Sequence, residues 1–438
     1  MGTGGSNPPF SAKERRRCDI VFFFGVWRSP ASAPALGAGG RRFESFCPDT
    51  VKQGVTKNRN SFVFLGENQN LHSICTPTFR TRIFPIFAFS KNGPMNPVAL
   101  RLLNQQLVAP QFADPADVVS HMGAIQAQEY RMMRWAVAMR TSKPSVKKFK
   151  EAYDSGRIIR LHLMRGTWQL VSAEDYWPML ELCSPKAITV TKGWMSSNKI
   201  SIPDDELMRI REILVETTAK KGSVTKEDFV QALAEKDIHM DDHRLSYHIR
   251  MGELSGTLCS GDLLPMKASY ALSTEKVWPK IKVDRDEALM HFTRKYFQSR
   301  QPATLEDFVW WSGLNISDCK KGIELLGDYL HVERWKGRDL YLTDDCRTRG
   351  FKKGKFLLIS PYDEYLIGYK SRDIVLPPEN KHRAHNNSGI FQPIIAHDGI
   401  ICGNWAPFKD ECWVDFFEGD FTTEDVQGEW GKYKRTMK

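Results

Sequence analysis

The chain has 438 residues, of which 41% are hydrophobic and 26% charged, so it is long enough for several domains with apolar cores. No apolar run approaches the roughly 20 residues that a membrane-spanning helix needs, and we expect no membrane partner. The net charge of +10 is concentrated at one end. Residues 1–94 hold 13 Lys and Arg against 5 Asp and Glu, which leaves a surplus of only two for the rest. Overall charge alone therefore does not predict nucleic-acid binding by the rest of the chain.

The nine cysteines are scattered, odd in number and without a Cys-x-x-Cys pair. This pattern argues against a disulfide framework and against a structural zinc site. No cluster of metal ligands, Gly-rich phosphate loop or Ser/Cys nucleophile motif stands out. We therefore expect reduced thiols in a cytoplasmic protein that uses no metal and no cofactor.

In chain order, the first segment is residues 1–94, which differs from the rest. Gly, Ser, Pro and Ala tracts alternate there with basic clusters such as Arg15–Arg17, without helical or strand periodicity. We predict a disordered or non-native extension, with Met95 as the working start. The alternative is a native basic tail, which would add salt-sensitive affinity for nucleic acid.

Residues 95–200 are predicted to form a first winged-helix-like unit, a variant of the helix-turn-helix. The apolar spacing indicates three helices, at Val98–Leu107, Pro115–Ile125 and Tyr130–Met139. Alternating patterns around a turn then indicate two strands, at Arg157–Met164 and Thr167–Val171.

An internal repeat predicts two further units, at 201–280 and 281–350. Thr225–Val230 and Thr304–Val309 match at five of six positions and lie 79 residues apart. In each copy the threonine and the acid three residues later can form a capping box before an amphipathic helix. A second helix and two strands follow in both, which is the element order of a winged helix.

Residues 351–438 are predicted to form a small antiparallel β domain. Strand-like segments separated by Pro and Gly turns occur at Phe356–Ile359, Tyr365–Tyr369, Ile390–Ala396 and Ile400–Trp405. The predicted fold class is thus α+β, with tandem winged-helix units and a C-terminal antiparallel β domain.

Positive charge is dense between Lys143 and Arg165, a stretch that contains seven basic residues and two acidic ones. Such a cluster favours contact with DNA phosphates, although an ordinary solvated helix face is the alternative. The candidate DNA-binding residues in and beside it are Arg131, Lys147, Lys148, Arg157, Arg160, Arg165 and Thr167.

Four segments together resemble the winged-helix family of the AlkZ and YcaQ bacterial DNA glycosylases. They are Ala124–Tyr130, Arg160–Thr167, Pro361–Tyr369, and Gly389–Pro393 with Gly403–Trp405. The resemblance implies a cytosolic bacterial enzyme that excises N-alkylated bases from double-stranded DNA or acts on interstrand crosslinks. We also expect it to work as a monomer.

The resemblance further implies catalytic roles for Gln126 and Gln128, because the AlkZ motif is Gln, a hydrophobic residue, Gln. YcaQ carries Asp at the second position, so this chain resembles the AlkZ branch. Two departures bear on fine specificity. Ser371 precedes Arg372 where Asp is expected, and Gln169 stands where His is expected.

Two glutamines make chemical sense for one class of substrate. An amide is no general base near neutral pH, but it can hold a water, accepting through oxygen and donating through nitrogen. An N7- or N3-alkylpurine is already cationic and leaves without protonation, so an oriented water can capture the oxocarbenium-like sugar. Amide carbonyl dipoles can stabilise that positive charge. Both side chains reach the same side only if this segment is extended rather than helical.

The sequence leaves open the roles of two acidic residues, and it allows two other functions. Asp363 and Glu364 either supplement the site or satisfy backbone and arginine partners in the β domain. The alternative functions are a non-catalytic winged-helix DNA-binding protein, such as a transcription regulator, and a winged-helix scaffold for protein partners. A regulator should bind in a sequence-dependent way, whereas a glycosylase should produce alkali-labile sites.

Overall fold

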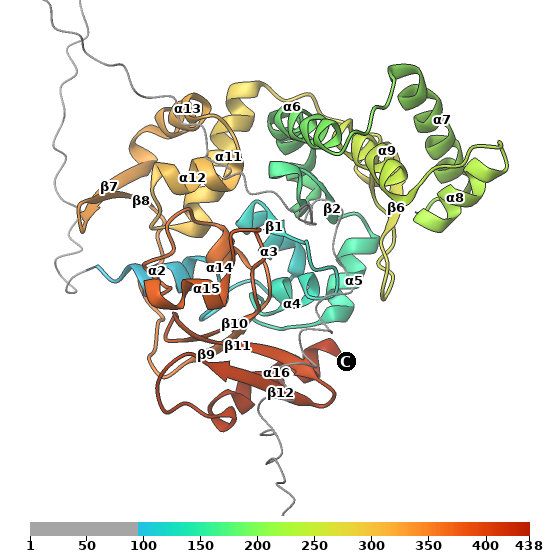
Figure 1. The fold of residues 1–438 in the computed structure, drawn as a ribbon. Helices are drawn as coiled ribbons and strands as arrows, with labels where there is room; N and C mark the ends of the chain where they lie inside the picture. The colour runs from blue at the N-terminus through green and yellow to red at the C-terminus, as the bar shows by residue number, and fades with distance from the viewer. Residues whose placement is uncertain (1–94) are drawn as a thin grey trace, which may run out of the picture. The chain divides into compact units, whose positions relative to one another are not determined.

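The computed structural model describes residues 95–438, so the predicted extension at 1–94 lies outside the described residues. The described chain runs from α2 to α16 as a mixture of helices and small antiparallel sheets (Figure 1). Within this part, no helix is both long enough and apolar enough to cross a membrane.

The first segment holds most of the predicted elements and one unexpected strand. Its elements are α2 (Pro97–Asn104), α3 (Pro115–Met122), β1 (Ile125–Gln126), α4 (Met133–Ala138), α5 (Val146–Asp154), β2 (Ile158–His162), β3 (Trp168–Ser172) and α6 (Ala173–Ser197). Asn96, Asp114 and Ser145 cap α2, α3 and α5, each accepting a hydrogen bond from a backbone N–H of the first turn. The helix predicted to reach Ile125 ends at Met122, because Gly123 adopts a positive φ of 68°. The chain then enters β1 of a three-stranded sheet, in the order β1-β3-β2.

The second segment contains α7 (Asp204–Lys221), β4 (Val224–Thr225), α8 (Lys226–Ala234), α9 (Asp242–Leu254), β5 (Leu258–Ser260), β6 (Ser269–Leu272) and α10 (Ser273–Lys276). The third contains α11 (Arg285–Arg300), α12 (Leu305–Ser312), α13 (Ile316–Leu326), β7 (Leu330–Trp335) and β8 (Arg338–Thr343). The two predicted capping boxes are confirmed: Thr225 with Asp228, and Thr304 with Asp307. Each begins a short helix that is followed by a second helix and two antiparallel strands.

The C-terminal segment forms a four-stranded antiparallel sheet in the order β12-β11-β10-β9. Its elements are β9 (Phe356–Ile359), α14 (Glu364–Ile367), α15 (Lys381–Ala384), β10 (Ile394–His397), β11 (Ile400–Phe408), β12 (Glu411–Phe416) and α16 (Gln427–Met437). The prediction of a strand at Tyr365–Tyr369 was wrong. Asp363 caps a helical turn there by accepting from the backbone N–H of Tyr365, so α14 forms instead.

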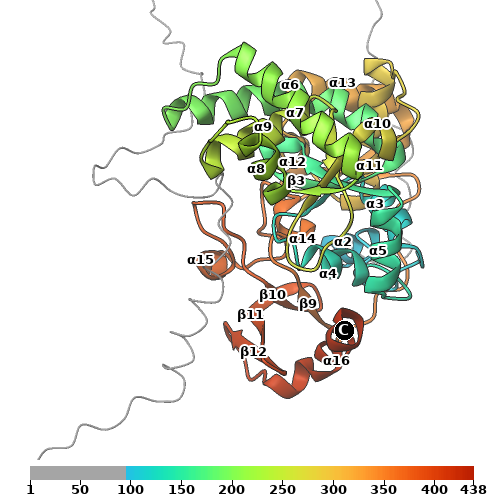
Figure 2. The ribbon, with the colours of Figure 1, turned by 90° about the vertical axis from the view of Figure 1, so that its right-hand side faces the viewer.

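Two apolar cores join segments that are far apart in the sequence. One packs α2 and α4 of the first segment against α14 and the C-terminal sheet, and α16 lies against α4 (Figure 2). The other packs β2, β3 and α6 against α11 and α12 of the third segment. The strand β1 and the start of α14 thereby lie where the first, third and C-terminal segments meet, as the contacts around Glu364 show.

Candidate active site

The Gln126–Gln128 segment is extended at its start and is fixed by its neighbours. Gln126 lies in β1, opposite Gln169 of β3, and the backbone N–H of Ala127 donates to the Trp168 carbonyl at 2.8 Å. Gln126 is therefore extended, as a shared side for both amides would require, whereas Gln128 lies in the bend that follows β1. Directly opposed residues of an antiparallel pair project from the same face, so Gln169 is the cross-strand neighbour of Gln126.

The three glutamine side chains around β1 differ in whether their carbonyl oxygens accept a hydrogen bond. The Oε1 atom of Gln126 accepts from Arg165 at 3.2 Å. In contrast, the Oε1 atoms of Gln128 and Gln169 are shielded from solvent and lack a hydrogen-bond partner within residues 95–438. A buried carbonyl oxygen without a donor has lost its hydration without compensation. Of the two motif glutamines, Gln128 is thus the one whose oxygen is free within the described residues to accept a hydrogen bond from a bound water.

Arg165, predicted to contact DNA, holds the side chain of Gln126. It sits in the turn between β2 and β3 with a left-handed φ of 55°. Its guanidinium donates to Gln126 and to the carbonyls of Trp310 and Trp311. Burial lowers the pKa of Arg165 from its ordinary value, and nearby Glu364 opposes this shift. Because its donors are engaged within the chain, Arg165 orients the Gln126 amide oxygen.

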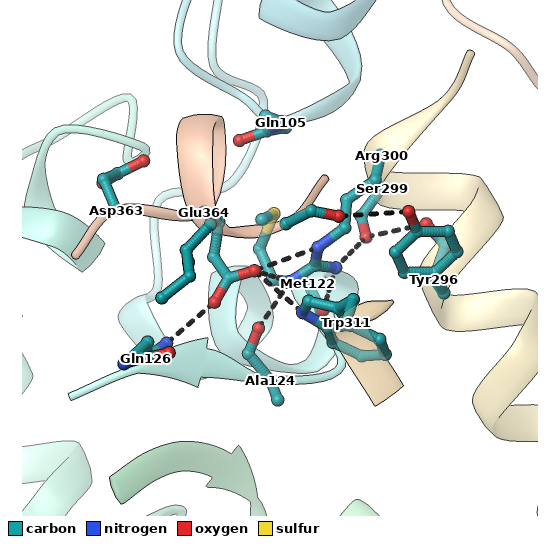
Figure 3. Close-up of polar contacts among 12 residues, drawn as sticks. Gln105, Met122, Ala124, Gln126, Tyr296, Ser299, Arg300, Trp311, Asp363 and Glu364 are labelled. Atoms are coloured by element: carbon teal, nitrogen blue, oxygen red, sulfur yellow. Dashed lines mark hydrogen bonds and ion pairs between the residues drawn. The ribbon is translucent and has the colours of Figure 1, made fainter. Parts of the chain in front are cut away.

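Glu364 fixes the backbone of the same strand (Figure 3). One carboxylate oxygen accepts from the backbone N–H of Gln126 at 2.9 Å. The other accepts from Trp311 at 2.9 Å and from Arg300 at 2.7 and 3.1 Å. Glu364 and Arg300 are 1% and 0% exposed, so this is a buried, fully hydrogen-bonded ion pair.

Arg300 extends this network to the end of α3. It donates to the carbonyls of Met122 and Ala124, both at 2.7 Å, on the two sides of the turn that leads into β1 (Figure 3). The roles of Arg300 and Trp311 in this network were not anticipated from the sequence. They lie in α11 and α12, more than 170 residues from the motif, and no local pattern links them to it.

Asp363, whose role the sequence left open along with that of Glu364, has partners that stabilise the fold. It forms a bidentate ion pair with Arg140, at 2.6 and 2.9 Å, and both residues are buried. It also accepts from Ser360 and caps α14. Both acids therefore satisfy backbone and arginine partners, but only Glu364 contacts the Gln-Ala-Gln segment.

The other predicted DNA-binding residues divide into two groups. Arg160 is only 5% exposed and donates to the Ala127 carbonyl at 3.1 and 3.2 Å, so the structure places it beneath the motif and not on a phosphate-facing surface. Thr167 is half-buried and donates to the Met164 carbonyl at 3.1 Å. The exposed members are Arg131, Lys147, Lys148 and Arg157, the last of which is paired with Asp114 at 2.7 Å.

His121, at the end of α3, makes this region sensitive to acid. Burial lowers its pKa to about 4, opposed by a 2.7 Å contact with the Asn104 carbonyl and reinforced by the charges of Arg300 and Lys295. Its folded pKa lies below the ordinary value of 6.5, so its contribution to stability is lost as pH falls from about 6.5 towards 4. His121→Gln should therefore lower the midpoint of acid unfolding followed by circular dichroism. The exposed His239→Gln variant is the control, and an unchanged midpoint in His121→Gln would contradict this assignment.

Among residues 95–438, no group of three or more His, Cys, Asp or Glu side chains is placed to hold a metal ion. What the arrangement offers is two amides next to a buried ion pair, with an unpaired acceptor on Gln128. These groups can hold and orient a water or stabilise a positive charge, but they include no acid-base pair of carboxylates.

The chain matches the family of AlkZ-like DNA glycosylases over residues 119–414, a range that includes both glutamines and Glu364. It therefore belongs to that family and is a DNA glycosylase. A curated relative, the interstrand DNA cross-link repair glycosylase of Streptomyces sahachiroi, is 24% identical over 330 residues, which are 70% of this chain and 87% of the relative. The solved structure of Streptomyces sahachiroi DNA glycosylase AlkZ has the same fold, with a TM-score of 0.62 at 21% identity, over 78% of this chain and 96% of that one.

Proposed function

We propose that this DNA glycosylase hydrolyses the N-glycosidic bond of cationic N-alkylated purines and leaves an abasic site. The observation that carries the proposal is the pair of amides, Gln126 held by Arg165 and Gln128 with an acceptor that has no partner among residues 95–438. In this scheme Gln128 accepts a hydrogen bond from the attacking water. Gln126 has its oxygen occupied, so its NH2 group can donate to the water or to the substrate.

The choice of substrate follows from what the site lacks. Gln126 and Gln128 cannot protonate a leaving base, so a neutral purine would depart slowly, whereas an N7- or N3-alkylpurine carries its positive charge before the reaction. The curated relative is a cross-link repair glycosylase, and an interstrand crosslink through alkylated purines presents the same leaving group. We therefore include unhooking of such crosslinks in the proposal.

The test compares charged and neutral leaving groups in one sequence context. The full-length chain is incubated with a duplex that carries a single N7-methylguanine and with the same duplex carrying guanine, followed by mild alkali. Strand cleavage only at the alkylated position, above a control without enzyme, supports the proposal. Equal cleavage of both duplexes, or of neither, would contradict it.

For the architecture, we propose that residues 95–200, 201–280 and 281–350 are winged-helix units of a monomer and that 351–438 form a β domain. The support is the element order, in which a capped helix, a second helix and a two-stranded ribbon recur after Thr225 and Thr304. The same element order would also fit a transcription regulator, but the family match identifies the chain as a DNA glycosylase.

We further propose that Lys147 and Lys148, both exposed on α5, contact DNA phosphates. Each phosphate contact contributes about 0.9 to the slope of log affinity against log salt concentration. The double variant Lys147→Gln/Lys148→Gln should therefore reduce that slope by about 2. The matched control is Lys220→Gln/Lys221→Gln on α7, for which the slope should not change, and equal slopes for all three proteins would refute these contacts.

A further inference from the structure

A cavity of about 800 Å³ lies apart from the two catalytic glutamines. Its walls are the start of α12, the turn of the β7–β8 hairpin, the segment 370–373 and the region of α15. Neither Gln126 nor Gln128 lines it, and the roles proposed above do not involve it.

Two nitrogen atoms in the wall of this cavity lack acceptors. Nε2 of His385 and Nη2 of Arg372 are shielded from solvent and have no partner in the part of the chain that the structure describes. His385 is only 8% exposed. The two side chains flank Phe391, whose ring centroid lies 5.1 Å from the His385 ring and 5.0 Å from the Arg372 guanidinium carbon. Two buried nitrogens without a partner in one cavity wall indicate that a ligand atom is missing there.

The charges around the cavity indicate that this acceptor is an anion. Three of the four lining carboxylates are already engaged: Asp307 by the backbone N–H groups of Lys370 and Ser371, Asp339 by Arg334, and Asp373 by Arg338. The fourth, Glu306, is exposed. Three lining cations form no ion pair among residues 95–438, namely Lys370, Lys381 and Arg372.

The protonation states suit a bound anion at neutral pH. Burial lowers the pKa of Arg372 only to about 10, so it keeps its charge. Burial, together with the charges of Arg372 and Lys381, lowers the pKa of His385 to about 4. His385 is therefore uncharged, and its Nε2 donates to an acceptor in the tautomer that carries the proton on that nitrogen.

The cavity is connected to the catalytic glutamines through one tryptophan. Arg372 lies over the ring of Trp310, at 5.4 Å from its centroid. The Trp310 carbonyl accepts from Arg165 at 3.2 Å, and Arg165 in turn holds Gln126. A chain of three contacts thus links the cavity wall to Gln126.

We propose that this cavity is an oxyanion subsite that binds a backbone phosphate of DNA near the target nucleotide. Arg372 and His385 donate to the phosphate oxygens, and Lys370 and Lys381 add positive charge. Because both free nitrogens are shielded, the Arg372 guanidinium and the His385 ring must both rotate to reach the anion. Rotation of the guanidinium gives up a long 3.4 Å hydrogen bond from Nη1 to the Lys370 carbonyl and disturbs the 3.0 Å hydrogen bond from Nε to the Leu366 carbonyl, losses that the bonds to the phosphate offset. The inference depends on DNA being the substrate but not on the glutamine chemistry.

The first test measures binding of an undamaged duplex by the full-length chain, which does not depend on excision. Arg372→Gln should weaken binding and reduce the slope of log affinity against log salt by about 1. Arg383→Gln, which removes the same charge from α15 but does not line the cavity, should leave the slope unchanged. If Arg372→Gln fails to fold, the exposed Lys381→Gln takes its place. A folded variant at either position with the parental slope and affinity overturns the proposal.

The second test identifies the source of the anion from the NMR signal of the His385 Nε2 nitrogen. A shift on adding duplex, but not on adding millimolar inorganic phosphate, supports binding of a backbone phosphate. A shift with both additions supports a general oxyanion subsite that DNA occupies. A shift with inorganic phosphate alone overturns the DNA assignment, and no shift with either overturns the site. His385→Phe, which keeps a ring against Phe391 without a donor, should weaken duplex binding without changing the salt slope.

Discussion

Replacing Gln128 by alanine should lower the single-turnover rate of N7-methylguanine excision by at least about 100-fold, with duplex affinity retained. Positioned groups that act in the transition state typically contribute factors of this size. The change removes the one motif oxygen that has no partner in the described part of the chain, so no hydrogen bond seen there is broken and the fold should be unaffected. Rates are measured with enzyme in excess, and affinity is measured on the undamaged duplex.

The matched control is Gln231→Ala, which removes an exposed glutamine from α8. It should leave both rate and affinity unchanged. A Gln128→Ala protein that excises the base at the parental rate would show that Gln128 holds no catalytic water, whatever the role of Gln126.

Replacing Glu364 by alanine should reduce the free energy of unfolding by about 3–5 kcal/mol, because it leaves the buried Arg300 guanidinium without its counter-charge. The same change removes the acceptor for the backbone N–H of Gln126 and for Trp311. Urea unfolding followed by tryptophan fluorescence measures the loss. Excision should slow in any protein that remains folded, since β1 would no longer be anchored from the C-terminal segment.

Two comparisons make this result specific. Glu306→Ala removes an exposed acid on α12 and should change stability by no more than about 0.5 kcal/mol. Glu364→Gln keeps the shape and one acceptor oxygen and should lie between the alanine variant and the parent. Parental stability of Glu364→Ala would contradict the role of the buried ion pair.

The elements that could be predicted are those specified by neighbouring residues. Thr225 and Thr304 begin helices because the acid three residues later completes the capping box within one turn. The segment Tyr365–Tyr369 misled because its short run of apolar residues fits a strand equally well. There the cap provided by Asp363 decides in favour of a helical turn.

The candidate site could be predicted only in part, because its residues are brought together over long distances. Gln126 and Gln128 drew attention through family resemblance, since the tripeptide alone is unremarkable. The partners of the motif lie in the third and C-terminal segments, so only the tertiary structure reveals that Glu364 binds the Gln126 backbone. Arg160 shows the converse difficulty. Its place in a basic cluster indicated DNA contact, whereas burial beneath Ala127 gives it a positioning role.

The most direct test of the proposed chemistry compares the parent with the Gln126→Ala/Gln128→Ala double variant on the N7-methylguanine duplex, at enzyme concentrations that saturate binding for both. Mild alkali then reports abasic sites. We predict strand cleavage by the parent and none above the enzyme-free control by the double variant. Equal cleavage by the two proteins would contradict the assignment of catalysis to the two glutamines.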